Sequence, residues 1–457
     1  MTSAVVRDLA SSFTGAVFTP DHPEFDAAAG VYQLAATGRP AVVVRPRDAV
    51  DVARAIACAR EHGLEIAVRG GGHSSAGHST GDGALVIDMR GFRDLTVDPG
   101  ARRLRAGAGL DAGTVVAAAH EHGLTVPFGD NGAVGIAGIT LGGGMGYLSR
   151  QHGLTVDHLM SAELVTADGR IVTTSAAEEP ELFWAIRGGG GNFGVVTSLE
   201  FNMVEAGMVY GGAMLLPPTP DVLRGVTPLA GAAPRELGVI ANVMPAPPAP
   251  FVPPEMIGRP VVVIAGCYNG DAVAGAAAWA PFRALAKPIA DIVGPMPYPA
   301  LYRLTEAAAV PSVGVGRSMF VEVVDDTVVA TLREAYLASP GVRTMIQVRV
   351  LGGAVADVPS NATAYAHRTA PVHLMALATA ATPEAAAPCR DWAEEILRQL
   401  RGRGIGAYAN FLEDEGEARV RDAYPNTTYK RLAVVKAAWD PDNVFHRNQN
   451  IRPAGTP

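Results

Sequence analysis

The stretch Arg69-Gly70-Gly71-Gly72-His73-Ser74 follows directly after residues 64–68, which the sequence predicts as a β-strand. Three consecutive glycines permit positive φ angles and let successive backbone N–H groups approach an anion without interference from Cβ atoms. A diphosphate is the natural occupant of such a nest. Taken alone, the motif also fits an ordinary glycine-rich turn with an incidental histidine, so its meaning depends on the rest of the chain.

Two further glycine runs follow in the same half of the chain. Residues 134–147 read VGIAGITLGGGMGY, and we expect them to form a loop that lies too close to its ligand for side chains, as around ribityl and phosphate groups. Residues 187–196 read RGGGGNFGVV and lead into another predicted strand. Three such runs exceed what turns alone require.

Residues 131–149 imitate a membrane span, because they hold no charged side chain over 19 residues. Seven of these 19 residues are glycine, and the Gly138/Gly142 spacing is what any glycine-dense run produces by chance. We therefore predict a cofactor-binding segment here and no membrane contact.

Composition excludes several classes of protein. The chain has 457 residues, of which 48% are apolar and 18% charged, enough for cores in roughly two to three domains. A net charge of -8 without any Lys/Arg-rich block argues against nucleic acid and anionic membranes as partners. Three distant cysteines and an N-terminus without a secretory pattern predict a cytoplasmic protein without disulfides.

The pattern of elements changes along the chain. Strand 41–44, a helix capped by Asp48 and ended by Gly63, and strand 64–68 are typical of α/β structure, and a second helix is expected from Asp111 to His122. After Phe201 the texture shifts, and we expect a second domain from about residue 206. Its predicted elements are strands at 260–265, 319–324, 344–350 and 371–377 and helices at 328–338 and 391–401.

Taken together, these motifs resemble the berberine-bridge-enzyme-like branch of the vanillyl-alcohol-oxidase superfamily, which has a PCMH-type FAD-binding domain. Its R-x-G-G-H motif matches Arg69 to His73, and residues 181–201, 440–443 and 448–450 resemble other family hallmarks. The resemblance implies an α+β fold. An FAD-binding domain of two α/β subdomains would span 1–205. A substrate domain with a mostly antiparallel sheet covered by helices would span 206–404, and residues 405–457 would return to the FAD domain.

The resemblance also implies the cofactor and its ligands. His73 would bond covalently to the flavin 8α carbon, and the family's second, cysteinyl link is missing because Asn131 stands at that position. Val134 would be a small residue that admits oxygen to the flavin, or would simply pack under the ring. The predicted cofactor-binding residues are His73, Arg69, Gly70, Gly71, Gly72, Ser74, Gly77, Asn131, Val134, Gly135, Gly138, Thr140, Gly143, Gly144, Gly146, Val195, Val196, Asn410, Asn448 and Asn450.

A general base must remove a proton as hydride leaves the substrate carbon for flavin N5. The family's Y-x-N motif implies Tyr408 for this role, and strand periodicity would put Tyr408 and Asn410 on one face. A phenolate at neutral pH needs a cation or hydrogen bonds to stabilise it. Tyr365 and His367, predicted on one face of another strand, could assist Tyr408 or have a structural role. Tyr147 and Tyr298 are further candidates for lining the pocket.

Only 6% of the residues are aromatic, which favours a small, moderately apolar substrate over a long glycan that would need aromatic platforms. We expect an oxidase that passes electrons to molecular oxygen and yields hydrogen peroxide. The alternatives are a dehydrogenase, cyclase or monooxygenase on the same fold, or a flavin-binding protein without turnover. His73 and His78 lie in a loop without cysteines or clustered carboxylates, so no metal site is expected. The oligomeric state stays open.

Overall fold

Helix α3 (Ala49–Glu61) begins and ends where the sequence predicts. The Asp48 side chain accepts a hydrogen bond from the Asp51 N–H at 2.9 Å, and Gly63 takes a positive φ of 63° after the last turn. The apolar face of α3 packs against strands of two different sheets. This helix therefore joins the two layers of the N-terminal half.

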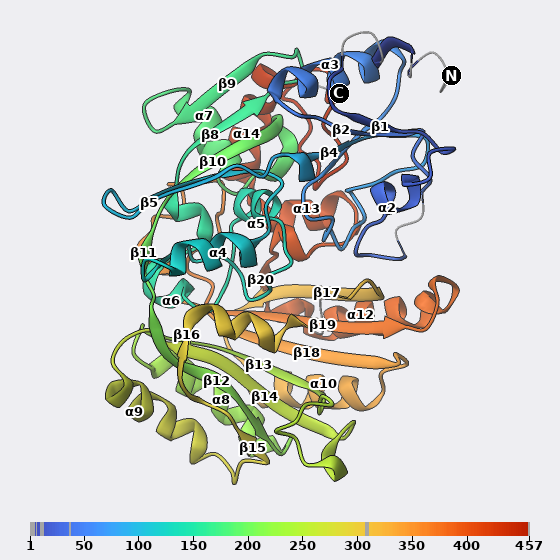
Figure 1. Ribbon diagram of the computed structural model, residues 1–457. Helices are drawn as coiled ribbons and strands as arrows, with labels where there is room; N and C mark the ends of the chain where they lie inside the picture. Colours follow the sequence, from blue (N-terminus) through green and yellow to red (C-terminus); the bar gives the residue numbers. More distant parts are fainter. Residues whose placement is uncertain (1–4, 6, 10–12, 36–37, 307–309, 456–457) are drawn as a thin grey trace.

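A computed structural model describes residues 5, 7–9, 13–35, 38–306 and 310–455 (Figure 1). Its first sheet has the strand order β1-β2-β4-β3, in which β1 runs antiparallel to β2 and the other neighbours are parallel. The second sheet is antiparallel, with the order β5-β6-β10-β8-β9. These strands are β1 (Ala16–Phe18), β2 (Val42–Arg45), β3 (Ile66–Arg69), β4 (Leu85–Asp88), β5 (Leu95–Asp98), β6 (Arg103–Gly107), β8 (Leu159–Val165), β9 (Ile171–Ser175) and β10 (Val195–Asn202).

Short helices and one small strand pair complete this half of the chain. The pair is formed by β7 (Leu124–Thr125) and β11 (Val204–Glu205). The helices are α2 (Phe25–Ala29), α4 (Ala112–His120), α5 (Ile136–Gly142), α6 (Ser149–His152) and α7 (Pro180–Ile186), with 3-10 turns η1 (Met89–Gly91), η2 (Thr155–His158) and η3 (Gly190–Asn192). Asp111 caps α4 by accepting a hydrogen bond from the Thr114 N–H, as expected for the second predicted helix.

The second half is built on one antiparallel sheet of nine strands, ordered β15-β12-β14-β13-β18-β19-β17-β20, with β16 beside β12. Helices α8, α9, α10 and α12 pack on its outer face, in the lower part of Figure 1. The strands are β12 (Met208–Leu216), β13 (Leu237–Pro245), β14 (Pro260–Tyr268), β15 (Ala290–Asp291), β16 (Gly294–Pro297), β17 (Val313–Val321), β18 (Arg343–Val350), β19 (Val372–Ala380) and β20 (Gly404–Gly406). The helices are α8 (Pro220–Ala232), α9 (Ala272–Arg283), α10 (Asp326–Leu337), α11 (Ala354–Asp357) and α12 (Ala386–Leu400), with η4 (Pro254–Met256), η5 (Tyr298–Leu304), η7 (Pro383–Ala385) and η8 (Arg401–Arg403).

One predicted strand of this sheet is misplaced. The sequence predicts a strand at 319–324, whereas β17 starts six residues earlier, at Val313, and ends at Val321. Gly314 and Gly316 hide the start from a propensity argument, because glycine is a poor strand former. After β17 the chain turns towards Asp325, whose carboxylate caps α10 through the Val328 N–H. The expected α+β fold, with a mostly antiparallel sheet covered by helices, is confirmed.

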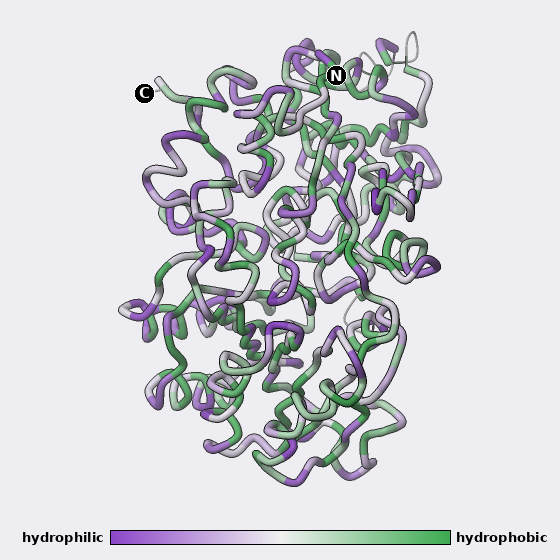
Figure 2. The backbone as a smooth tube through the Cα atoms, turned by 90° about the vertical axis from the view of Figure 1, so that its left-hand side faces the viewer, coloured by the Kyte–Doolittle hydropathy of each residue, from purple (hydrophilic) through white to green (hydrophobic). Residues whose placement is uncertain are grey.

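The last part of the chain packs onto the first half. Turn η9 (Ala409–Phe411) and helices α13 (Glu417–Ala423) and α14 (Asn426–Trp439), drawn in red, lie among the blue and green elements in Figure 1. One hydrophobic core runs from Val5 to Ile451 and holds side chains of both helices. Figure 2 shows apolar and polar stretches interspersed along the backbone, with polar segments on many outer loops. The exact three-part division of the chain stays a prediction.

Among the described residues, no helix is long and apolar enough to cross a membrane. The glycine-rich stretch that imitates a span contains only the seven-residue helix α5 and the start of α6.

Candidate active site and cofactor cradle

Two of the three glycine clusters pack backbone against backbone. A Cβ atom at Gly71 would lie 2.4 Å from the Gly135 nitrogen, and one at Gly135 would lie 2.3 Å from the Gly71 nitrogen. No side chain fits in either place. The contact brings His73, which follows β3, next to the segment that holds Asn131 and Val134.

The second cluster is not the loop that the sequence predicts. Residues 136–142 form helix α5, in which the Thr140 hydroxyl donates to the Ile136 carbonyl at 2.6 Å. The predicted role of Thr140 as a cofactor ligand therefore does not use this hydroxyl proton. Burial of Ile136 and Leu141 in the core holds the helix despite its glycines, because tertiary packing overrides weak local propensity.

Three glycines at the end of α5 and just after it make room for protein side chains. A Cβ at Gly142 would meet the Asn410 amide at 2.1 Å. One at Gly143 would meet the Tyr365 ring at 2.8 Å, and one at Gly144 would meet the Thr155 hydroxyl at 2.1 Å. These glycines let the catalytic candidates approach the α5 segment.

The Tyr408 hydroxyl oxygen lies at the centre of this contact. It accepts one hydrogen bond from the Gly144 N–H and a second from the Asn410 side-chain amide, both at 2.9 Å. Burial raises the pKa of Tyr408, while the two hydrogen bonds and the positive charge of Arg349 oppose that rise. The second donor, Asn410, also bonds to the Ile139 carbonyl at 3.2 Å. The side chain at position 408 is thus held by donors that favour its ionised form.

The local structure around Tyr408 differs from the prediction. Strand β20 ends at Gly406, and Tyr408 precedes the 3-10 turn η9, so strand periodicity is not what brings Tyr408 and Asn410 together. The pairing of their side chains was nevertheless expected. A single 3-10 turn and a two-residue strand step both leave alternate residues close enough for this bond.

The two proposed assistants of Tyr408 lie in different surroundings. Tyr365 packs edge-on against the Tyr408 ring with centroids 6.0 Å apart, and its hydroxyl reaches only the Met145 sulfur at 3.9 Å. His367 bonds through Nε2 to the Asp422 carbonyl at 2.8 Å and packs on Phe320. Both lie in an irregular segment, so the predicted strand at 364–368 is wrong. The segment resembles a strand only in its alternating pattern.

His73 stacks on Tyr32, with ring centroids 4.6 Å apart and planes 19° from parallel. Burial lowers the pKa of His73 below its usual value, and the charge of Arg69 acts in the same direction, whereas a hydrogen bond to the Ala133 backbone raises it. A neutral imidazole is the nucleophilic form. The histidine of the first glycine cluster is therefore oriented and uncharged at neutral pH.

Other predicted site residues form hydrogen bonds with backbone groups of the protein. Arg69 donates to the Ala28 carbonyl, the Ser74 hydroxyl accepts from the His78 N–H at 3.3 Å, and the Asn131 side chain accepts from the Ala133 N–H at 2.9 Å. Val195 and Val196 are buried at the start of β10, as expected for the strand after the third glycine run. Gly77 has a positive φ of 73°.

Sequence reasoning missed two residues on the sheet face beside Tyr408, and the carboxylate partner of one of them. His373 on β19 is fully buried, neither of its ring nitrogens has a hydrogen-bond partner, and its ring lies 6.2 Å from that of Tyr408. Arg349 on β18 forms a buried ion pair with Asp130, which precedes Asn131. No sequence signal marks these positions, because they are brought together only by contacts between distant parts of the chain.

Comparison with known proteins places these features in a family. Family models described as "FAD binding domain" and "Berberine and berberine like" match residues 40–175 and 407–452. The chain is 31% identical to (R)-6-hydroxynicotine oxidase of Paenarthrobacter nicotinovorans over 460 residues, which cover 97% of this chain and 98% of that relative. The chain belongs to the berberine-bridge-enzyme-like family of FAD-linked oxidases.

Solved structures of the family superimpose on nearly the whole chain. 6-Hydroxy-D-nicotine oxidase of Arthrobacter nicotinovorans is 27% identical, with a TM-score of 0.84 over 96% of this chain and 98% of that structure. Glucooligosaccharide oxidase of Acremonium strictum, studied for its 6-S-cysteinyl, 8α-N1-histidyl FAD, is 23% identical with a TM-score of 0.86, over 99% of this chain and 100% of that structure. At that identity the second likeness shows the fold alone.

The residues of this berberine-bridge-enzyme-like oxidase fit FAD. Several buried polar atoms have no hydrogen-bond partner among the described residues, including Arg69 Nε, His78 Nε2, Asn448 Oδ1 and Asn450 Oδ1. His78 and both asparagines line a cavity of about 330 Å³ together with Arg447 and Arg452. A Cβ at Gly138, Gly190 or Gly191 would meet nothing within 4 Å, so the backbone there is open to a ligand. Unpaired polar groups and open glycine backbone are what a dinucleotide cofactor requires.

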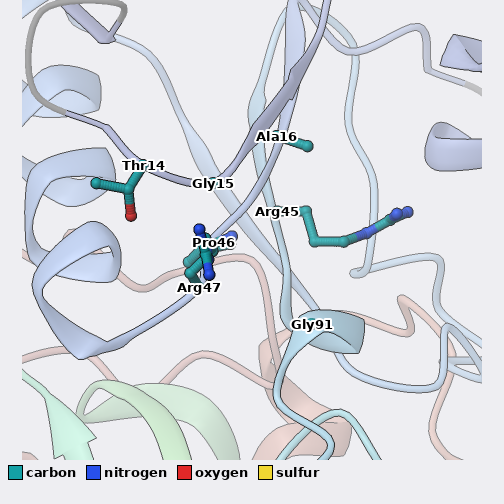
Figure 3. Close-up of a pocket in the computed structure, with 7 residues that line it drawn as sticks. All are labelled: Thr14, Gly15, Ala16, Arg45, Pro46, Arg47 and Gly91. Carbon is teal, nitrogen blue, oxygen red and sulfur yellow. The ribbon is translucent and has the colours of Figure 1, made fainter.

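A larger cavity, of about 490 Å³, lies elsewhere on the oxidase, at the junction of β1 and β2 (Figure 3). None of the predicted site residues lines it. The guanidinium group of Arg45 at its wall is already paired with buried Asp88 at 2.9 Å. We expect the flavin between the glycine clusters at residues 69–74, 134–147 and 187–196, and not in this cavity.

One group of possible metal ligands exists among the described residues. Asp8, Cys58 and His62 place their ligand atoms within 4.8 Å of one another. Burial raises the pKa of the Cys58 thiol to about 12. Cys58 lies on α3, His62 caps the C-terminus of that helix and Asp8 comes from the N-terminal segment, and the group was not expected from the sequence.

Proposed function

We propose that this oxidase carries FAD through a single covalent bond on His73 and uses Tyr408 as the base that accepts the substrate proton. The substrate would be a small, moderately apolar alcohol or amine, and molecular oxygen would be the final acceptor. When bound, FAD supplies the site that accepts hydride. The observation that carries the proposal is the Tyr408 oxygen, which accepts hydrogen bonds from both Gly144 and Asn410.

One backbone donor and one side-chain donor bond to the Tyr408 oxygen, and together they favour release of its proton. The Gly144 N–H and the Asn410 amide are both committed as donors, and neither can accept the phenol proton through these bonds. That proton is left to point elsewhere. A phenolate formed here keeps both hydrogen bonds and is further favoured by nearby positive charge. Tyr408 can therefore take a proton from a substrate hydroxyl or amine.

A single link on His73 is supported by what surrounds the flavin cradle. The Asn131 side chain, at the position of the family's second link, bonds to the Ala133 N–H and has no sulfur to offer. Cys58, Cys267 and Cys389 are all buried. The oriented, neutral imidazole of His73 is then the one nucleophile proposed for the 8α carbon.

The tryptophans support a small substrate. Trp184, Trp279 and Trp392 donate their indole N–H groups to backbone carbonyls of Asn361, Tyr210 and Ala335 and are packed in the protein. They offer no stacking platform for sugar rings. A relative that covers 97% of this chain is named for a hydroxynicotine, which is a compound of the proposed size.

Oxygen as acceptor and the site of action in the cell are also proposals. The small side chain of Val134 supports access of oxygen, and its carbonyl accepts from the Ala112 N–H at 2.9 Å, which fixes the segment. A dehydrogenase or monooxygenase would share the fold and the flavin but would not form hydrogen peroxide in proportion to oxygen consumed, and a cyclase would be distinguished by its ring-closed product. A cytoplasmic location stays a prediction.

Acid precipitation of the purified yellow protein tests the covalent link. We expect the flavin to stay with the pellet and to be found, after proteolysis and mass analysis, on the peptide that contains His73 and on no other. His73→Ala should release the flavin into the supernatant, whereas the control His122→Ala, at an exposed histidine after α4, should retain it. Flavin in the wild-type supernatant, or attached to a second peptide, would overturn the single link.

Anaerobic flavin reduction tests the base. The first compounds to screen are 6-hydroxynicotine and simple amines and alcohols. With any that reduces the flavin, Tyr408→Phe should slow reduction by about 10²-fold or more, as expected for loss of a general base. Tyr365→Phe is the matched control, because its hydroxyl contacts only a sulfur, and it should change the rate little. Equal rates in Tyr408→Phe and wild type would remove Tyr408 from the mechanism.

A further inference from the structure

A buried ion pair crosses from the flavin-binding half to the sheet of the second half. Arg349 Nη2 lies 3.1 and 3.0 Å from the two carboxylate oxygens of Asp130, which is 219 residues away in sequence. The Arg349 side chain is 6% exposed and that of Asp130 is 19% exposed. A charge pair at such a depth is costly to desolvate and is retained only with further bonds.

Those further bonds are present on Arg349. Its Nε donates to Gln347 Oε1 at 2.6 Å, and the Gln347 amide donates in turn to Asn242 Oδ1 at 2.9 Å. Gln347 and Arg349 alternate along β18 and face the same side, towards the flavin-binding half. The guanidinium group is thus fixed in position by Asp130 and by Gln347, which Asn242 holds in turn.

The fixed guanidinium stands close to the Tyr408 ring. Its carbon lies 5.3 Å from the centre of the Phe411 ring, which packs edge-on against Tyr408 at 5.1 Å. His373 is the cross-strand neighbour of Arg349 and lies 6.2 Å from Tyr408. Aromatic rings and a buried histidine separate the two groups, so the field between them is weakly screened.

Other titratable groups around Tyr408 carry little net charge. Tyr365 and Tyr424 pack near it, and burial raises the pKa of both phenols, so both are neutral at physiological pH. Burial lowers the pKa of His373 well below its usual value, and the charge of Arg349 adds to that effect. Behind Tyr365, Arg368 and Asp157 form a bidentate pair that cancels its own charge. Arg349 is therefore the cation whose charge acts most directly on the Tyr408 phenol.

We propose that the Arg349–Asp130 pair is a positioning device for the Tyr408 base, in which Arg349 supplies the positive charge that stabilises the phenolate and Asp130 limits that charge. The proposal rests on the proposed role of Tyr408. It adds a residue pair that spans both halves of the molecule, so the strength of the base depends on their docking. Asp130 directly precedes Asn131, and the pair thereby also ties the segment beside the flavin to the substrate sheet.

The charge argument predicts opposite shifts from the two partners. Arg349→Met removes the cation and should raise the pKa of Tyr408 by about one unit. Asp130→Asn removes the compensating anion and should lower that pKa. Arg349→Lys keeps the charge and should leave the pKa near that of the wild type. A purely structural role would disturb the site in one direction, whichever partner is removed.

The measurement is an NMR pH titration of the flavin-loaded enzyme labelled with [13Cζ]tyrosine. Tyr408→Phe assigns the Tyr408 signal, which reports phenol and phenolate directly and needs no substrate. A rise in Arg349→Met, a fall in Asp130→Asn and rescue by Arg349→Lys support the proposal. The double variant Arg349→Met/Asp130→Asn, which leaves no unpaired charge, serves if a single variant fails to fold, and its Tyr408 pKa should lie between those of the two single variants or near that of the wild type.

Two outcomes overturn the inference. An unchanged or lowered Tyr408 pKa in Arg349→Met would show that Arg349 does not stabilise the phenolate, and a rise in Asp130→Asn would show that Asp130 does not limit the charge. Neither outcome bears on whether Tyr408 is the base, because that is decided by flavin reduction in Tyr408→Phe. The two ideas therefore fail independently.

Discussion

Gly71 and Gly135 show how a single missing Cβ can decide where His73, the proposed flavin-linking histidine, lies. Their backbones touch, and any side chain at either position would push the His73 turn away from the segment that follows Asn131. Gly138, by contrast, has open space where a Cβ would be, although it belongs to the same glycine cluster. Glycine is therefore required at different positions of one motif for different physical reasons.

This difference can be measured by alanine substitution. Gly71→Ala should destabilise the protein by about 2 kcal/mol or more, because the added methyl overlaps backbone atoms that cannot move aside. Gly138→Ala lies in helix α5, where alanine costs nothing and can stabilise by about 0.5–1 kcal/mol. If Gly138 faces the cofactor, as proposed, this variant should still lose flavin content. Thermal unfolding and the ratio of flavin to protein absorbance read out the two effects.

Two results would contradict this reading of the glycines. A Gly71→Ala protein as stable as the wild type would show that the close approach to Gly135 can relax. Full flavin content in Gly138→Ala would show that the open space there is not part of the cradle.

At the scale of elements, helix α14 anchors the C-terminal return through its last turn. Lys436 and Asp440 are both fully buried, with Nζ 2.6 Å from the carboxylate. Lys436 also donates to the carbonyls of Asn192 and Phe445, and the Asp440 carboxylate accepts from the Phe445 N–H. One ion pair therefore joins the third glycine cluster to the segment that carries Asn448.

Loss of this ion pair should destabilise the segments that carry Asn192 and Asn448. Lys436→Met leaves Asp440 as an uncompensated buried charge and should cost about 3–5 kcal/mol. Flavin content should fall with it. Arg103→Met is the control, in the half of the molecule onto which α14 packs. The ion pair of Arg103 with Glu200 is half exposed and should contribute less than about 1 kcal/mol. Chemical denaturation of both variants gives the comparison, and equal losses would refute the anchoring role.

The elements themselves were largely predictable, with errors of a definite kind. Amphipathic helices with an aspartate cap, such as α3 and α4, begin where the sequence indicates, because capping and periodicity are local signals. The segment around Tyr408 and the one around Tyr365 were predicted as strands and are irregular. Alternation over five residues is too short to distinguish a strand from a chain held in place by other parts of the molecule.

At the scale of the whole molecule, the two halves are joined by arginines as well as by shared apolar cores. Arg150 at α6 donates to the carbonyls of Leu237, Leu351 and Ala233 in the second half, and Arg349 reaches back to Asp130. Directional bonds of this kind fix orientation as well as contact. The Tyr408 segment lies at this junction, so the position of the Tyr408 side chain depends on how the two halves dock.

The sequence by itself determined the glycine clusters, the histidine that follows the first of them, the Y-x-N motif and hence the family and its cofactor. These are short-range patterns in which backbone freedom and residue type suffice. Only the tertiary structure decided that Gly142 to Gly144 accommodate protein side chains, that His373 is buried without partners, and that Arg349 pairs with Asp130. Each of these depends on residues far apart in the chain meeting at a distance of a few ångströms. No local periodicity carries that information, because the contact is created only when the two halves dock.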